Sequence, residues 1–351
     1  MGVSGGLIVR EAFRDQARWC DQLGSPFTAR VCRLCAELLG ADIPIATSIL
    51  DWPGDPSVKA DSVPLRVAGA LHYLARSGRS PALRAAYPPH AANDDELWTA
   101  ISPALSAHEN VFRSYLDTAP QTNEVMRSAA LLPGLLRIAE LTHPRLDLYE
   151  IGASAGLNLI LDRYRYQFGS ATWGDGSSPL LLKPQWGGPA PPVGASLSIH
   201  SRRGVDLNPI DLRGEDARDR LLSYVWADQT ERLQRLTAAI SLWLRDPPSI
   251  ERADAAPWLE QSPITQAKAG TTRVLFHSVT WSYLPEATRD RITRFMRACG
   301  EQADERSPLA WLRFELSPKG AELQLTRWPG DADVLLATGH PHGTMVAWKA
   351  L

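Results

Sequence analysis

The chain has 351 residues, which is enough for two domains of ordinary size. Hydrophobic residues make up 44% and charged residues 22%, as in globular proteins, and the net charge of −2 predicts no surface for a polyanion. No apolar run reaches the ~18 residues of a membrane span, and the N-terminal segment lacks the basic and apolar regions of a signal peptide. We therefore expect a cytoplasmic protein with no nucleic-acid and no membrane partner.

Residues 1–120 have the apolar spacing of helices and contain no convincing strand. Cys32 and Cys35 lie on one face of the second of these helices, without a second cysteine pair or a nearby histidine at ligand spacing. We expect buried thiols and no metal site there. The segment is predicted to be a separate helical domain, with helices over 7–23, 27–40, 63–77, 80–86 and 94–117.

A further helix is expected over 122–142, and polar residues crowd its beginning. Thr122 suits the N-cap, and Glu124 suits the positive end of the helix dipole. Capping explains these residue types, but the helix leads directly into the next strand. Asn123, Glu124 and Arg127 are therefore candidates to face a bound substrate.

The stretch 146–164 contains the densest set of candidate ligand-binding residues. A short apolar strand ends at Glu150, glycines follow at 152 and 156, and apolar residues then resume at helical spacing. Strand, glycine turn and helix N-terminus in this order place backbone N–H groups in front of a ligand. The predicted contact residues of this turn are Glu150, Gly152, Ala153, Ser154 and Gly156.

Two functional interpretations fit this turn. Gly152-x-Ser154-x-Gly156 matches the nucleophile elbow of serine hydrolases, with Asp254 and His340 or His342 following in the chain order of such triads. Glu150-x-Gly152-x-x-x-Gly156 resembles the first motif of class I methyltransferases that use S-adenosylmethionine (SAM). The resemblance implies that the acid orients the methionine end of SAM and that the turn passes beside it. Ser154 replaces the usual middle glycine of that motif.

After an insertion at 166–195 that is rich in Gly, Pro and Trp, a strand is expected over about 197–206. It ends at Asp206, with Asn208 just beyond. A carboxylate at the end of a second strand accepts hydrogen bonds from both hydroxyls of a ribose. The methyltransferase resemblance gives Asp206 this role, and it gives Asp254 and Ala255, at the end of a short strand over 249–253, contact with adenine.

The remaining strands are expected over 272–277 and 309–316, and an alternating tail follows. By the rule that ligands bind at the carboxyl ends of parallel strands, His277 and Ser278 end the fourth strand near the transferred methyl group. We name His277 the candidate base and His342 the alternative, because histidine is the commonest general base near neutral pH. Trp281 and Tyr283 are candidate substrate contacts.

Strands alternating with helices predict an α/β fold, a doubly wound Rossmann-like sheet with antiparallel C-terminal strands, preceded by the helical module. The predicted domains are 1–120, a lid or substrate module, and 121–351. The whole chain also resembles an uncharacterised bacterial family. The predicted function is SAM-dependent methylation of a small molecule. The alternatives are a catalytically silent SAM-fold binding protein and a serine hydrolase.

Overall fold

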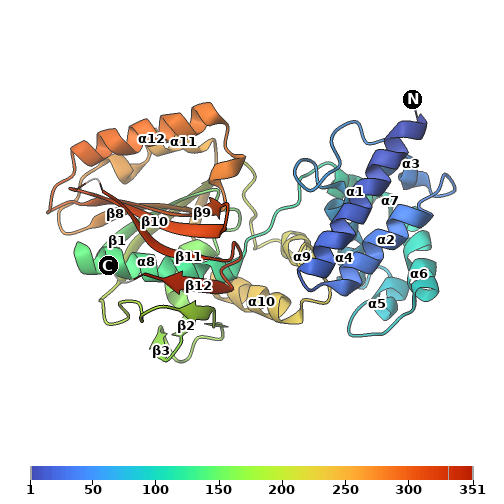
Figure 1. Ribbon diagram of the computed structural model, residues 1–351, viewed down its shortest axis with the longest axis horizontal. Coiled ribbons are helices and arrows are strands. Elements are labelled where there is room, and N and C mark those ends of the chain that lie inside the picture. Colours follow the sequence, from blue (N-terminus) through green and yellow to red (C-terminus); the bar gives the residue numbers. More distant parts are fainter. Residues whose placement is uncertain (1, 331, 350–351) are drawn as a thin grey trace. The chain divides into compact units, whose positions relative to one another are not determined.

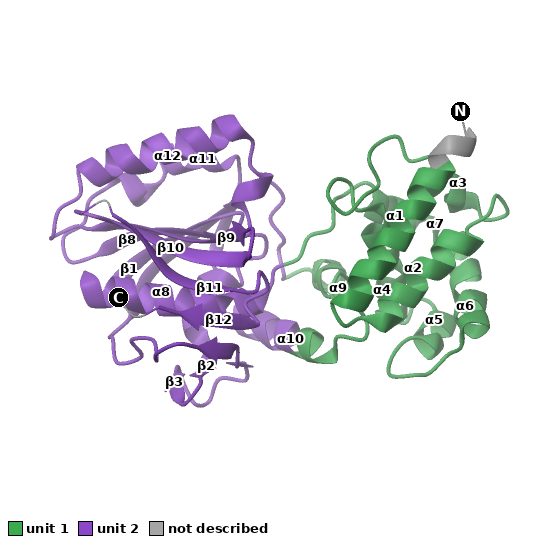
Figure 2. Ribbon diagram, in the orientation of Figure 1, with its two compact units in different colours: residues 1–122, 213–234 green, residues 123–212, 235–351 purple. Residues whose placement is uncertain are grey.

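The computed structural model describes residues 2–330 and 332–349. It divides into two compact units, one of residues 1–122 and 213–234 and the other of residues 123–212 and 235–351 (Figure 2). The stretch 213–234 therefore packs with the helical unit, although it follows the second main strand in the chain. The predicted boundary after residue 120 stays a prediction.

The first unit is helical. Proline in the first turn begins each helix from α2 to α5, and Asn93 and Glu96 form a capping box at the start of α6. Gly69 lets α4 approach the ring of Tyr224, which a Cβ at this position would meet at 2.8 Å. The helices are α1 Gly2–Gln22, α2 Pro26–Leu38, α3 Pro44–Leu50, α4 Val63–Arg76, α5 Pro81–Ala86, α6 Asp94–Ala107, α7 Glu109–Leu116, α9 Glu215–Ser223 and, running on into the second unit, α10 Thr230–Arg245.

The helix expected over 94–117 is two helices. His108 has φ −121° and ψ 35°, outside the α-helical region, so α6 ends and α7 begins at this residue. The apolar spacing continues across the break, which is why the sequence pattern does not reveal it. The other predicted helices of this segment agree with α1, α2, α4 and α5 to within a few residues at their ends.

In the described part of the second unit, nine strands form one sheet in the order β5-β12-β11-β10-β9-β8-β1-β6-β7. The strands from β7 to β9 are parallel, and β10, β11 and β12 continue antiparallel. The predicted α/β class with a mostly parallel sheet is confirmed, whereas the specific methyltransferase-like sheet stays a prediction. The strands are β1 Arg145–Ile151, β5 Gln185–Gly187, β6 Ser198–Asp206, β7 Ser249–Arg252, β8 Thr272–Ser278, β9 Leu309–Ser317, β10 Gly320–Trp328, β11 Asp333–Gly339 and β12 Met345–Trp348.

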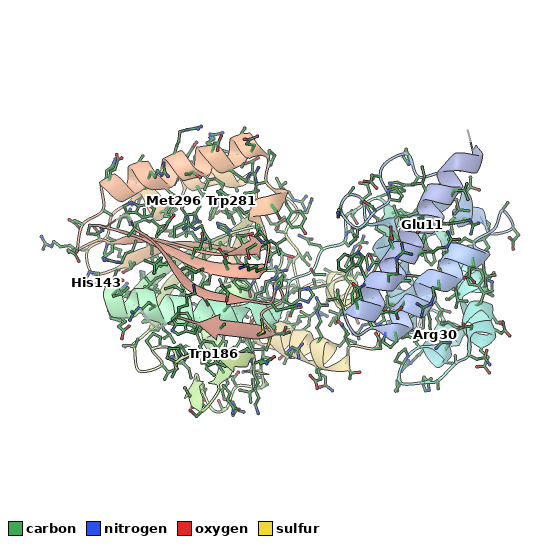
Figure 3. The ribbon with its side chains drawn as sticks, viewed as in Figure 1. Glu11, Arg30, His143, Trp186, Trp281 and Met296 are labelled. Atoms are coloured by element: carbon green, nitrogen blue, oxygen red, sulfur yellow. The ribbon has the colours of Figure 1, made fainter. Side chains whose placement is uncertain are left out.

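Helices cover both faces of this sheet (Figure 1). On one face lies α8, Ser128–Leu141, whose Gly134 lets the helix backbone rest on Leu312. On the other lie α11, Ala255–Gln261, and α12, Glu286–Glu301. On this α12 side of the strands, Met296 is part of an apolar core, and Trp281 packs against that core (Figure 3). Burial of both faces of the central strands explains their nearly continuous apolar runs.

The insertion at 166–195 contains short strands joined by turns and loops. β2 (Arg165–Phe168), β3 (Ala171–Trp173) and β4 (Leu181–Leu182) form a small separate sheet, while β5 pairs with β12 at the edge of the large sheet. The side chain of Trp186 in β5 stacks on that of Trp348 at 6.1 Å between ring centroids. The aromatic residues of the insertion therefore anchor it to the sheet unit.

The helix expected after the glycine turn is not formed. A short 3₁₀ helix, η2, spans Asn158–Arg163 and is broken by non-helical dihedrals at Ile160. The hydroxyl groups of Tyr164 and Tyr166 donate to the carbonyls of Leu157 and Leu161, each at 2.6 Å. The Leu161 carbonyl also accepts from the N–H of Tyr164 at 3.3 Å, where η2 ends and the chain turns into β2. The predicted helix after the glycine turn, whose N-terminus would face a ligand, is therefore wrong.

Candidate functional site

The order of the strands reverses beside β1. The chain passes from β1 to β6 and β7 on one side, and then returns to β8 and β9 on the other. In open parallel sheets, ligands bind at such a switch point, outside the carboxyl ends of the strands. Because β1, β6, β7 and β8 are parallel neighbours, their carboxyl ends share one edge. We call this edge, with the residues that follow each strand, the carboxyl edge.

Three predicted acids lie in series along the carboxyl edge. Glu150 is near the end of β1, Asp206 ends β6, and Asp254 follows β7. The Asp206 carboxylate accepts hydrogen bonds from the backbone N–H groups of Ser154 and Asn208, both at 2.8 Å, and so ties the glycine turn to β6. Asp254 caps α11 by accepting from the N–H of Ala256 at 3.1 Å. These two carboxylates therefore hold the residues that follow β1 and β7 in place.

Glu150 is the most unusual of these acids because it is 1% exposed. Burial raises its pKa well above the ordinary value, and the nearby charge of Asp206 raises it further. A hydrogen bond from Asn158 and the charge of Arg127 act in the opposite direction. Among the described residues, its Oε2 atom has no hydrogen-bond partner, and neither does the buried Oγ of Ser154. Two buried polar atoms without partners at a strand end are what a polar ligand would satisfy.

The glycines of the turn are explained by backbone conformation and by packing within the protein. Gly152 and Gly156 have φ of +66° and +73°, which residues with a Cβ rarely adopt. A Cβ on Gly152 would meet Thr280 at 2.4 Å, and one on Gly156 would meet Ile250 at 2.7 Å. Atoms of the protein itself thus occupy the space that a side chain at position 152 or 156 would need. Any ligand here would contact the side chains of the carboxyl edge rather than a space left by these glycines.

The predicted substrate residues before α8 lie at the same edge. Asn123 accepts from the N–H of Leu157 at 3.0 Å, directly after the glycine turn. Glu124 caps the short 3₁₀ helix Val125–Arg127. Arg127 donates to the carbonyl of Ser278 at 3.1 Å and to that of Pro341 at 3.0 Å. It therefore joins the end of β8 to the turn that precedes β12.

His342 lies in that turn, which packs closely on the Arg127 segment. A Cβ on Gly343 would meet the carbonyl oxygen of Met126 at 2.3 Å. The His342 N–H donates to Nδ1 of His340 at 3.1 Å, and the two rings are 5.2 Å apart. The structure thus brings His342 into the polar surroundings of the carboxyl edge through Arg127.

His277 is fully buried near the end of β8, and both of its ring nitrogens are engaged. The indole of Trp311 donates to Nε2 at 3.1 Å, so Nε2 carries no proton. Nδ1–H donates to Glu315 at 2.5 Å. The ring is therefore neutral and hydrogen-bonded on both sides. A role as general base would require one of these bonds to open.

Glu315 was not among the predicted site residues. Its carboxylate also accepts from the backbone N–H groups of Thr280 and Trp281 at 3.0–3.1 Å, and so fixes the loop after β8. In the sequence, the alternation of Trp311, Arg313 and Glu315 along one strand is the signal for a polar face. Of the other predicted residues, Trp281 stacks on His277 at 5.1 Å, whereas Tyr283 is 79% exposed.

The described residues lack two features that would point to other kinds of site. No helix there is long and apolar enough to cross a membrane. No group of three or more His, Cys, Asp or Glu side chains lies close enough together there to hold a metal ion. The predicted buried thiols are present, since Cys20, Cys32 and Cys35 are all buried and unoxidised.

One protein family matches the chain. Its description is "Uncharacterized protein conserved in bacteria (DUF2332)", and its model covers residues 10–348. No curated protein and no solved structure matches the chain. The match spans both units, so the helical unit and the sheet unit occur together in that family.

Proposed function

The chain belongs to this bacterial family, whose description states no activity, and we propose that it is a SAM-dependent methyltransferase acting on a small molecule. The observation that carries the proposal is the series Glu150, Asp206 and Asp254 along the carboxyl ends of three adjacent parallel strands. In class I methyltransferases, which this segment resembles, acids in this order meet the methionine, ribose and adenine parts of SAM.

The residues at the carboxyl edge fit such a ligand. Glu150 offers an unpartnered buried oxygen to the methionine ammonium group, and Ser154 offers a second unpartnered polar atom. Asp206 accepts from the backbone of the glycine turn and of Asn208, and in the methyltransferase resemblance the acid at this position meets the ribose hydroxyls. SAM, when bound, would supply an electrophilic methyl group. The task of this chain is then to orient the acceptor and to take up its proton.

The two candidate bases are His277 and His342, and they lie in different surroundings. His277 would have to release either the indole of Trp311 or Glu315, because each of its ring nitrogens has one of these partners. His342 lies on the turn that Arg127 ties to the end of β8. We therefore propose a positioning role for His277, which orders the loop of Trp281 through Glu315, and keep His342 as the second candidate base.

Removing the Asp206 carboxylate tests the proposed cofactor site. Asp206→Ala is expected to weaken SAM binding by about 1–3 kcal/mol, the cost of losing a buried hydrogen-bonding partner. Asp290→Ala, at an exposed position of α12, is the control and should bind as the unmodified chain does. Equal SAM affinity in the Asp206 and Asp290 variants, measured by calorimetry, would contradict the assignment. So would an Asp206 variant that loses SAM only because it is unfolded.

Ser154 is the reason to keep a serine hydrolase as the second candidate. Its φ of +55° is unusual for a residue other than glycine and matches the strained turn of a nucleophile elbow. Its buried Oγ, however, has no hydrogen-bond partner among the described residues, so no base activates it there. Labelling by a fluorophosphonate probe that disappears in Ser154→Ala would favour the hydrolase.

A catalytically silent binding protein would share the SAM affinity and the response to Asp206→Ala. The two proposals differ only in turnover. Transfer of label from methyl-labelled SAM to any member of a small-molecule acceptor panel would favour the enzyme.

A further inference from the structure

A second site lies on the face of the sheet that carries α12. A cavity of about 850 Å³ opens there between α12 and strands β8 to β11, within the size range of small-molecule sites. Its floor is formed by alternate residues of β9 and β10, and α12 contributes one wall with Thr293, Arg297 and Glu301. We call this cavity the β9–β10 groove. The SAM proposal uses His277, Trp281 and Glu315 at its border but none of the β10 and α12 residues that line it.

The two faces of β9 and β10 differ sharply in polarity. Leu312, Phe314, Leu323 and Leu325 are buried on the face that α8 covers. The opposite face carries Trp311, Arg313 and Glu315 on β9, and Glu322, Gln324 and Thr326 on β10. Because α12 covers only part of this polar face, a groove lined by hydrogen-bonding and aromatic groups is left.

Two carboxylates face each other at one end of the groove. Glu315 and Glu322 are directly opposite in the antiparallel pairing of β9 and β10, a position where like charges are unfavourable. Glu315 is held by backbone N–H groups and by a neutral histidine, none of which carries a positive charge. Glu322 accepts from the Gln324 amide at 3.1 Å. In the described residues, neither carboxylate forms an ion pair with Lys or Arg.

The cations of the groove are Arg313, two residues before Glu315 on β9, and Arg297 on α12. Arg313 donates to Asp333 at 2.8 Å and to Thr326 at 2.9 Å, and its guanidinium lies 4.6 Å from the centre of the Trp311 ring. Burial alone would raise the pKa of Asp333. Hydrogen bonds from Thr326 and Arg313, together with the charges of Arg313 and Arg297, outweigh burial and lower this pKa. Both arginines thus act on Asp333, and in the described residues neither forms an ion pair with Glu315 or Glu322.

Aromatic rings line the same acidic end. Trp281 stacks on His277 and contacts Trp311 edge to face at 5.5 Å. Indole faces attract organic cations, and aromatic rings combined with carboxylates are the usual receptor for ammonium groups. We propose that the β9–β10 groove binds an organic cation whose ammonium group sits between Glu322, Glu315 and Trp281.

Binding at this site would reach the carboxyl edge through Glu315. Its carboxylate fixes the N–H groups of Thr280 and Trp281, and the Thr280 side chain occupies the place where a Cβ on Gly152 would lie. A cation drawn to Glu315 therefore acts on the loop that packs against the glycine turn. The affinity of the groove itself does not depend on whether SAM binds at that turn.

The test is a titration of the full chain, labelled with ¹⁵N on its tryptophan indoles, with benzyltrimethylammonium chloride. Resonances are assigned with Trp281→Phe and Trp311→Phe. We expect saturable shifts of the Trp281 and Trp311 indoles, and a roughly five- to tenfold weaker affinity in Glu322→Gln, the scale of one partly desolvated cation contact. Glu286→Gln, an exposed acid of α12, is the matched control and should change nothing.

Three results would overturn the proposal. One is the absence of shifts up to about 10 mM ligand, a concentration that would largely fill even a site of millimolar affinity. Another is the same shifts with uncharged benzyl alcohol at matched ionic strength, which would make the groove merely apolar. The third is equal affinity in Glu322→Gln and Glu286→Gln. Misfolding does not obscure the result, because Glu322→Gln relieves a like-charge pair and should leave thermal stability unchanged or higher.

Discussion

At the scale of single residues, two buried titratable groups set how stability responds to pH. Glu150 lies 1% exposed in the sheet unit, and His72 lies 6% exposed in the helical unit. Glu150 has an unpartnered oxygen, whereas His72 donates from Nδ1 to the carbonyl of Ser223 at 3.0 Å. The first is therefore a candidate for ligand binding, and the second is a satisfied core residue.

Glu150→Gln should stabilise the protein at neutral pH. Burial raises the pKa of Glu150, so its contribution to stability is present below the ordinary pKa near 4.5 and is lost as pH rises toward the native value. Glutamine stays neutral, so the variant should gain roughly 1 kcal/mol at pH 7.5 and nothing near pH 4, while binding SAM more weakly. Urea unfolding at the two pH values checks this. A variant less stable at pH 7.5 would mean that the carboxylate is ionised and paired.

His72 should make the helical unit sensitive to acid. Burial lowers its pKa from 6.5 to about 4, so the native state disfavours the proton that the unfolded chain accepts. The free energy of unfolding therefore has its full value above pH 6.5. It decreases as the pH drops toward 4, by roughly 2 kcal/mol between pH 7 and pH 5. His72→Gln keeps a donor for Ser223 and should flatten this part of the pH profile. Parallel profiles for both proteins would show that His72 is not responsible.

At the scale of elements, the loop after β8 connects the two candidate sites. Glu315 holds its backbone from β9, Val279 adopts φ of +50°, and Thr280 packs on the glycine turn after β1. The interlocking of this loop with the turn, rather than a space for a ligand, explains glycine at position 152.

Gly152→Ala should destabilise the protein for two separable reasons. A positive φ costs alanine about 1–2 kcal/mol, and the contact with Thr280 adds about 1–3 kcal/mol of overpacking. In Gly152→Ala combined with Thr280→Ala, the second cost should largely vanish while the first remains. A double-mutant cycle on unfolding free energies measures the difference. Strictly additive effects would show that the new Cβ does not meet Thr280.

The sequence predicted much of the element pattern and less of the site. The predicted bounds of β1, β6, β7, β8 and β9 agree with the structure to within a residue or two, and the buried strands β1 and β8 carry the apolar runs that such strands need. The sequence pattern missed the break at His108, where the apolar spacing continues, and it predicted a helix after Gly156 where the chain forms a short broken 3₁₀ helix. Glu315 escaped notice because its role depends on N–H groups 34 and 35 residues away in the chain.

At the scale of the whole molecule, the chain combines a helical unit with a sheet unit, and one family match covers both. The interpretation of residues 1–120 as a lid or substrate module stays a prediction, and the Trp-rich insertion at 166–195 is a second candidate segment for covering a small substrate. Limited proteolysis with and without SAM tests it, because ligand-linked closure slows cleavage where backbone opening is suppressed. Protection confined to residues outside both segments would remove the lid hypothesis.

The central claim is that the carboxyl edge of the sheet binds SAM, and calorimetric titration of the unmodified chain tests it most directly. The account predicts one SAM per chain and binding of the demethylated product S-adenosylhomocysteine as well, because Asp206 and Asp254 would contact the part that the two molecules share. It also predicts that both affinities fall in Asp206→Ala and stay unchanged in Asp290→Ala. A folded chain that takes up neither molecule at millimolar concentration would contradict it.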